Sequence, residues 1–134
     1  MQQNKQQGFS LLEILIAFSI LALSLGILLK IFSAGVNTAM IAENYSAAVQ
    51  LSESLMAKTG IETPLQTGQS TGLENNLYHW QVDVSPFTLN ADNIDTKTLT
   101  AELFKVKVTV NWGDGNASDR QVELITLKLI NKSL

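Results

Sequence analysis

The chain has 134 residues, a formal net charge of −3 at pH 7 and a sequence pI near 5.0. This acidic balance disfavours nucleic-acid binding, which normally requires a basic face or stripe. The chain contains no cysteine, which excludes disulfides and thiol-ligated metal sites, and its length suits one small domain.

A short polar leader precedes a long apolar run at the N-terminus. Residues 1–8 read MQQNKQQG, and residues 9–29 read FSLLEILIAFSILALSLGILL. About 20 helical residues rising ~1.5 Å each match a hydrocarbon core of ~30 Å, so this run is long enough to cross a bilayer. An ordinary secretory signal is cut after its apolar region at small residues, and no such site follows Leu29. The order of parts favours a cut before the run, between Gly8 and Phe9, which leaves the apolar helix as the permanent N-terminus.

Glu13 is the only ionisable residue of the apolar run. A charge at the centre of a membrane helix costs about 2.5–3.5 kcal/mol on the insertion scale, and acids inside membranes generally serve a function and have a partner. We therefore expect Glu13 to pair with a cationic group. The alternative is an ordinary single-span anchor that carries a chance glutamate near its end.

The helical pattern continues beyond the apolar run. Apolar residues recur at spacings of three or four along one face, at Ile41, Tyr45, Ala48, Leu51 and Leu55. We predict one helix over residues 9–57, with Gly60 as a left-handed cap after its end. The amphipathic segment 30–58 is expected to pack on a C-terminal domain formed by residues 59–134.

Alternating apolar and polar residues predict strands in the C-terminal part. Residues 78–85 and 104–112 alternate with a period of two, and a further strand is predicted over residues 120–129. In the last of these, the parity of the apolar residues changes, which indicates either a bulge or a strand that serves two faces. Residues 61–76 are rich in Gly, Thr, Gln and Asn and are predicted to form an irregular connector.

These elements predict an α+β fold. A small antiparallel sheet of three or more strands with one apolar face must be covered, and the amphipathic half of the helix is the obvious cover. Residues 113–116, GDGN, suit a hairpin between the last two strands because they tolerate positive φ.

Residues for catalysis or metal binding are sparse. His79 is the only histidine and lies on the polar side of its strand, so it cannot anchor a standard zinc site. Asp92 and Asp95 in a polar loop and the DGNAS segment that begins at Asp114 carry potential calcium ligands, but neither spacing fits a calcium loop. No nucleophile, phosphate-binding or dinucleotide motif is present. We predict no enzymatic activity, no cofactor and no metal.

Residues 8–13, GFSLLE, resemble the prepilin peptidase site of type IV pilins and of the pseudopilins of type II secretion. The resemblance implies that the leader 1–8 is removed after Gly8 and that the new N-terminal residue, Phe9, is methylated. It also implies that Glu13 interacts with an N-terminal amine during filament assembly. The later segments YHWQVDVSP, VKVTVNWGDGN and RQVELITLKL are similar to those of a minor pseudopilin, so the resemblance covers nearly the whole chain.

This resemblance implies the pilin fold and a structural role at the tip of a periplasmic pseudopilus. The expected partners are J-like and K-like minor subunits, the major pseudopilin and the prepilin peptidase. Lys5 on the leader side favours a cytoplasmic leader, a single-pass inner-membrane anchor and a periplasmic domain. Two alternatives stay open: a minor pilin of a type IV pilus used in adhesion, motility or DNA uptake, and a membrane-anchored periplasmic enzyme or receptor.

Overall fold

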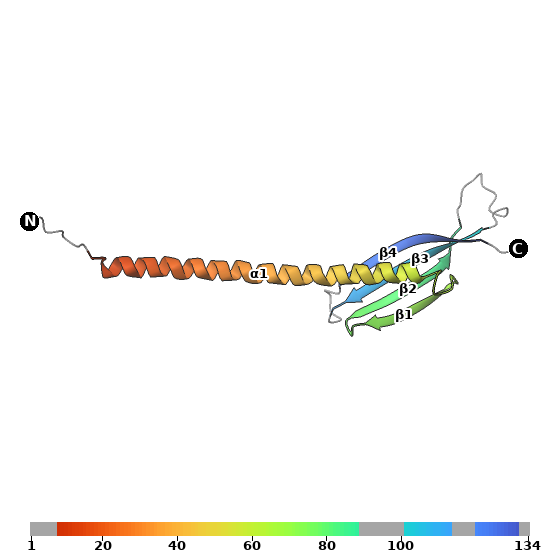
Figure 1. Ribbon diagram of the computed structural model, residues 1–134, viewed down its shortest axis with the longest axis horizontal. Coiled ribbons are helices and arrows are strands. Elements are labelled where there is room, and N and C mark those ends of the chain that lie inside the picture. The colour runs from red at the N-terminus through yellow and green to blue at the C-terminus, as the bar shows by residue number, and fades with distance from the viewer. Residues whose placement is uncertain (1–7, 89–100, 114–119, 132–134) are drawn as a thin grey trace, which may run out of the picture. The chain divides into compact units, whose positions relative to one another are not determined.

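The computed structural model describes residues 8–88, 101–113 and 120–131 (Figure 1). Within these residues one helix is followed by four strands, in the order α1 (Leu11–Lys58), β1 (Gly68–Glu74), β2 (Tyr78–Pro86), β3 (Ala101–Trp112) and β4 (Arg120–Asn131). The chain divides into two compact units, Met1–Ala42 and Glu43–Leu134, and α1 contributes residues to both. The predicted α+β class is confirmed.

The C-terminal end of α1 is capped by its own chain and by a strand. Gly60 has a φ of +87°, as its predicted role as a left-handed cap requires, and its N–H donates to the Thr63 carbonyl at 2.7 Å. Lys128 of β4 extends its ammonium to the carbonyls of Met56 and Thr59, at 2.5 Å each. The last carbonyls of a helix lack partners within the helix and carry partial negative charge, so this cation stabilises the helix end.

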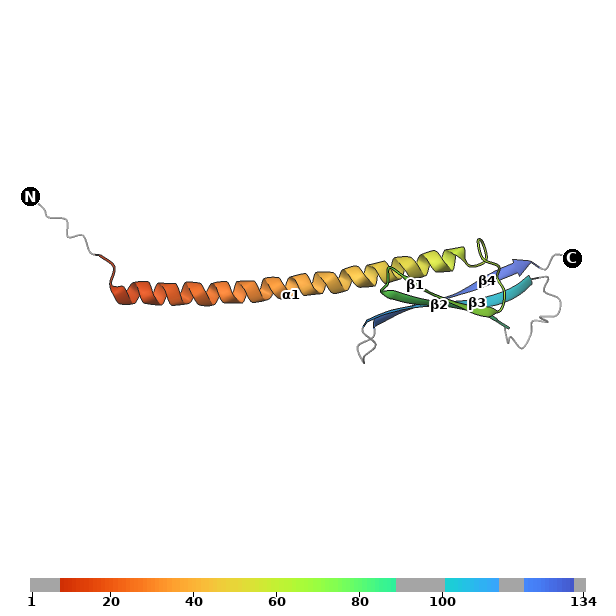
Figure 2. The same ribbon diagram turned by 90° about the horizontal axis from the view of Figure 1, so that it is seen from below.

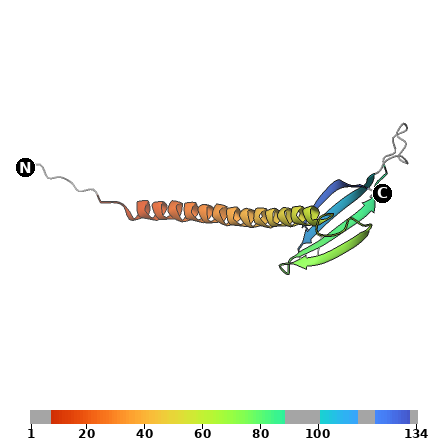
Figure 3. The same ribbon diagram turned by 45° about the vertical axis from the view of Figure 1, so that its right-hand side comes forward.

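The sheet is antiparallel with the strand order β1-β2-β3-β4, which Figure 3 shows from one side. Alternate residues of β2 and β3 point toward the last turns of α1, which lie on one side of the sheet in Figure 2. The sequence alternation predicted this buried face. The buried hydrophobic residues of the core are Ala48, Leu65, Tyr78, Val82, Val84, Phe104, Val106, Val108, Val110 and Trp112.

Aromatic rings connect α1 with the sheet at one end of this core. The Tyr45 ring meets Trp112 edge to face with centroids 4.7 Å apart, and Tyr78 lies on the same indole at 5.9 Å. The Tyr78 hydroxyl donates to the Asn44 side-chain oxygen at 3.4 Å. The part of the predicted apolar face from Tyr45 to Leu55 therefore packs on the sheet.

The prediction of an irregular connector over residues 61–76 is wrong, because β1 lies within it and pairs with β2 along its whole length. All residues of β1 except the half-buried Gly72 are exposed. Backbone pairing with β2, and not side-chain burial, therefore keeps β1 in the sheet. At Gly72 the Trp80 ring lies against the β1 backbone, and a methyl group added there would lie 2.3 Å from the ring. A glycine is required at this position because the indole occupies the space of a side chain.

Gly72→Ala is expected to lower the free energy of unfolding of the sheet unit by about 1–3 kcal/mol, because the added methyl group forces the Trp80 ring out of its place. Gly68→Ala in the same strand is the matched control, since an added Cβ there meets nothing within 4 Å. The control is expected to be neutral or to stabilise by up to about 1 kcal/mol. Urea unfolding of the full chain in detergent, followed by tryptophan fluorescence, measures both. Equal stability of the two variants would contradict the packing described for Trp80.

The parity change in β4 reflects a strand that serves two faces and not a bulge. Its pairing with β3 is uninterrupted from Ala101↔Asn131 to Trp112↔Arg120. Residues of one parity are half-buried on the helix side, as for Val122 and Leu124. The apolar residues of the other parity are exposed on the opposite face, namely Ile125, Leu127 and Leu129.

Candidate processing and assembly site

The predicted site residues lie in the first turn of α1 and directly before it. Ser10 is the residue before the helix, and its Oγ accepts a hydrogen bond from the Glu13 backbone N–H at 3.2 Å. In return, Glu13 Oε2 accepts the Ser10 backbone N–H at 3.0 Å. This reciprocal pair is a capping box, and it places a carboxylate in the first helical turn, where the helix dipole favours negative charge.

Ser10 is a site residue that the sequence prediction missed. The spacing Ser-x-x-Glu before an apolar run is the signature of a capping box and was available to find it. Glu13 consequently has a local hydrogen-bond partner before any second molecule is considered.

Gly8 and Phe9 precede the helix and have no regular secondary structure. Both are exposed, and Phe9 exposes 86% of its surface. A Cβ added at Gly8 would meet nothing within 4 Å. The bond between these residues therefore lies in an accessible segment directly before the helix cap.

The first part of α1 is apolar on all sides. Its large hydrophobic side chains from Leu11 to Phe32 each expose more than half of their surface, and the described residues contain one helix long and apolar enough to cross a membrane. Ser19 donates its hydroxyl to the Leu15 carbonyl at 2.7 Å, so this polar group brings no unpaired donor into an apolar environment. This composition fits a single-pass membrane anchor.

No group of three or more His, Cys, Asp and Glu residues is placed to hold a metal ion within the described ranges. His79 is exposed on β2, opposite Leu73 of β1 and Asn111 of β3. The acidic loop with Asp92 and Asp95, and the segment that begins at Asp114, lie outside the described residues.

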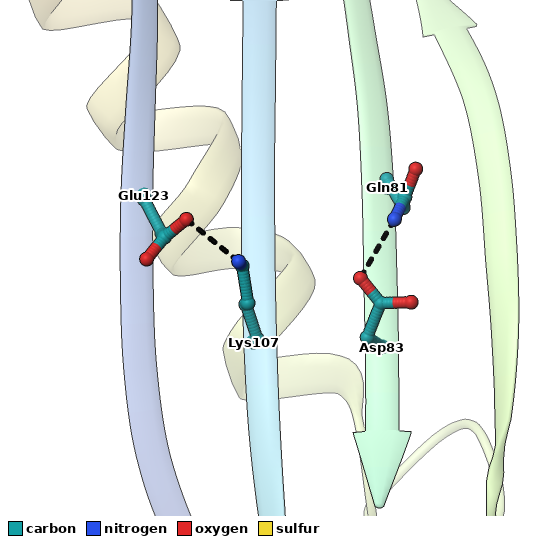
Figure 4. A network of polar contacts seen from close by, with 4 residues as sticks. All are labelled: Gln81, Asp83, Lys107 and Glu123. Carbon is teal, nitrogen blue, oxygen red and sulfur yellow. Dashed lines mark hydrogen bonds and ion pairs between the residues drawn. The ribbon is translucent and has the colours of Figure 1, made fainter.

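Polar side chains occupy part of the sheet face that points away from α1, as Figure 4 shows with the helix behind the strands. Lys107 and Glu123 form an ion pair at 2.9 Å across β3 and β4, and Gln81 donates to Asp83 at 2.7 Å along β2. The hydrogen bond that the Lys107 ammonium donates to Glu123, together with the negative charge of Glu123, raises the pKa of Lys107. Both partners of the ion pair remain more than one-third exposed, so the pair contributes little stability and belongs to a solvated surface.

Two comparisons identify relatives of the chain. Residues 3–29 match the family described as the prokaryotic N-terminal methylation motif. The chain is 34% identical over 114 residues to Type II secretion system protein I of Xanthomonas campestris pv. campestris, a match that covers 81% of each protein. No solved structure matches the chain. The extent of this identity, together with the N-terminal motif and a long apolar helix that continues onto an antiparallel sheet, shows that the chain belongs to the minor pseudopilin I family of type II secretion.

Proposed function

We propose that this pseudopilin is a structural, non-enzymatic subunit of the pseudopilus tip complex, which starts pseudopilus assembly and supports protein export across the outer membrane. The observation that carries the proposal is the 34% identity over 81% of the chain to a type II secretion system protein I. Pseudopilins and the prepilin peptidase are its partners in general, as the family implies. The specific partners that we propose are J-like and K-like minor subunits and the major pseudopilin.

Processing between Gly8 and Phe9 would preserve the capping box. The cut removes residues 1–8 but leaves the peptide bond between Phe9 and Ser10, so the Ser10 N–H that Glu13 accepts remains. Methylation of the new amine keeps it basic. The mature chain would then carry a cation on the residue next to its helix cap.

We further propose that Glu13 pairs with such an ammonium during assembly, either that of a neighbour or its own. The carboxylate stands in the first turn of a helix whose following residues to Leu29 carry no charge. In an apolar environment an unpaired charge is costly, so a pair at this depth fixes the axial position of one helix beside another.

The proposed organisation has four parts: a leader (1–8), a membrane segment (9–29), an amphipathic helical segment (30–58) and a sheet domain (59–134). The leader would face the cytoplasm, and the sheet domain would lie in the periplasm. The apolar composition of the first part of α1 supports the membrane segment, and Lys5 in the leader supports the orientation.

Deletion of the gene for this chain in its own organism is expected to trap exported proteins in the periplasm, and a copy of the gene should restore their export. Type IV pili should be unaffected, since they are assembled by a different system. Normal export after the deletion would contradict the proposal. Normal export together with a loss of pili and twitching motility would favour a minor pilin of a type IV pilus.

A further inference from the structure

β4 forms an edge of the sheet among the described residues, because the strand order gives it a neighbour only on the β3 side. An edge strand presents unpaired backbone N–H and C=O groups, and proteins commonly protect such edges with charged side chains, especially lysine. Residues 124–130 read LITLKLI and contain one charged residue, Lys128. The Lys128 ammonium donates hydrogen bonds to the carbonyls of Met56 and Thr59, so this charge does not protect the edge.

An exposed apolar row lies along this edge on the face away from α1. Ile125, Leu127 and Leu129 expose 56%, 46% and 68% of their surface and follow each other at every second position. Lys105 of β3 lies opposite Leu127 in the register, is exposed, and forms no ion pair among the described residues. An open backbone edge beside an apolar row and a cation suits an added strand with apolar residues and a carboxylate.

The direction of the strands restricts which chain can add to β4. Each step across this antiparallel sheet reverses the strand direction, so β1 and β4 run in opposite directions. A neighbour of the same fold and the same polarity therefore offers its first strand antiparallel to β4, with both helices on the same face of the joined sheet.

A second copy of this chain is a poor occupant. The residues of β1 that share the outer face are Gln69, Thr71 and Leu73, because they pair with the outer residues of β2. Two of these three are polar, so they would not match the apolar row of β4. The best occupant is a different subunit whose first strand is apolar on this face.

We propose that β4 binds the first strand of a neighbouring pseudopilin of different sequence by strand addition, with apolar side chains on its row Ile125, Leu127 and Leu129 and a carboxylate near Lys105. The inference rests on the proposed function, because pseudopilins are the partners proposed there for this chain. The contact is small by the standard of stable interfaces, so it adds to other contacts between the subunits. The mostly polar outer face of β1 disfavours extension of the sheet with copies of this chain.

Photo-crosslinking in cells with the complete secretion system tests this contact on the full chain. A benzophenone amino acid placed at Leu127 is expected to crosslink to another pseudopilin, at a position that mass spectrometry maps to its first strand. The same probe at Thr71, on the opposite edge, should give no crosslink to a second copy of this chain. A probe at Val36, which is exposed on α1, reports assembly without involving the sheet.

The outcomes separate this inference from the proposed function. Crosslinks from Val36 without any from Leu127 would overturn strand addition and leave the pseudopilin role intact. The same holds if the probe at Leu127 crosslinks to a second copy of this chain, or to a part of another pseudopilin outside its first strand. The absence of crosslinks from both Val36 and Leu127 would overturn strand addition and the proposed function together.

A substitution supplies a second readout. Leu127→Lys should reduce the crosslink yield from a probe at Leu129 by at least about tenfold, because a charge replaces the centre of the apolar row. Leu127 is half-exposed and outside the core, so the variant is expected to fold. Thr71→Lys on the other edge is the matched control and should leave the yield unchanged. An equal yield in both variants would contradict the contact.

Discussion

Glu13→Ala is expected to leave membrane insertion intact while reducing incorporation of the chain into the pseudopilus by at least about tenfold. Removing one partner of a buried ion pair leaves the other charge uncompensated, at a cost of about 3–5 kcal/mol, and each 1.4 kcal/mol corresponds to about tenfold in association. Insertion itself becomes easier because the apolar run 9–29 loses its only charged side chain. Crosslinking to neighbouring subunits measures incorporation, and carbonate extraction of membranes measures insertion.

The capping box supplies a second reason for a defect, and two variants separate it from the charge. Glu13→Gln keeps an acceptor for the Ser10 N–H but has no charge. Ser10→Ala keeps the charge but removes the cap hydroxyl, at a cost of about 1 kcal/mol to the helix. If the ion pair matters, Gln should behave like Ala at position 13, and Ser10→Ala should assemble almost normally.

Cleavage and methylation are measured in the same cells, because the alternative hypothesis is that Glu13 acts only in recognition by the peptidase or the methylating enzyme. A Glu13→Ala chain that is fully processed, crosslinks normally and supports export would contradict the role of the ion pair. A defect confined to cleavage or methylation would do the same.

Gly8→Leu is expected to keep the leader attached even in cells that contain prepilin peptidase. A Cβ at Gly8 meets nothing within 4 Å, so a larger side chain does not disturb this chain and its effect falls on the enzyme. Gly26→Leu is the matched control, since Gly26 has equally open surroundings but lies inside the helix, far from the cut. N-terminal sequencing and intact mass should find methylated Phe9 at the start of the control.

Efficient removal of the leader from Gly8→Leu would contradict the assignment of the cleavage site. A wild-type chain that keeps Met1 in the presence of the peptidase would contradict processing altogether.

The sequence predicted the elements whose side chains repeat with a clear period. The helix was within two residues of its observed bounds, and the alternating valines of β3 identified the centre of the sheet. β1 was missed because its sequence, GQSTGLE, has no apolar face and its order comes from backbone pairing with β2. The contact of Gly72 with Trp80 is equally absent from any local pattern.

The candidate site was accessible to sequence reasoning because it is local. Gly8, Phe9 and Glu13 follow from a short motif, and Ser10 could have been added from its spacing to Glu13. The cap of Lys128 on the end of α1 joins residues 69 and 72 positions apart in the sequence, so only the fold reveals it. The strand order makes β4 an edge among the described residues, and the contacts of Lys128 at the end of α1 leave this edge without a protecting charge. Neither feature can be read from the local sequence.

Co-purification tests most directly whether this chain is a minor subunit of a pseudopilus tip. The full chain is extracted in mild detergent from cells that also produce the prepilin peptidase and the J-like and K-like subunits. We expect the three subunits to elute as one complex in which this chain begins at Phe9. A chain that stays alone in every pairwise and three-way combination would contradict this role.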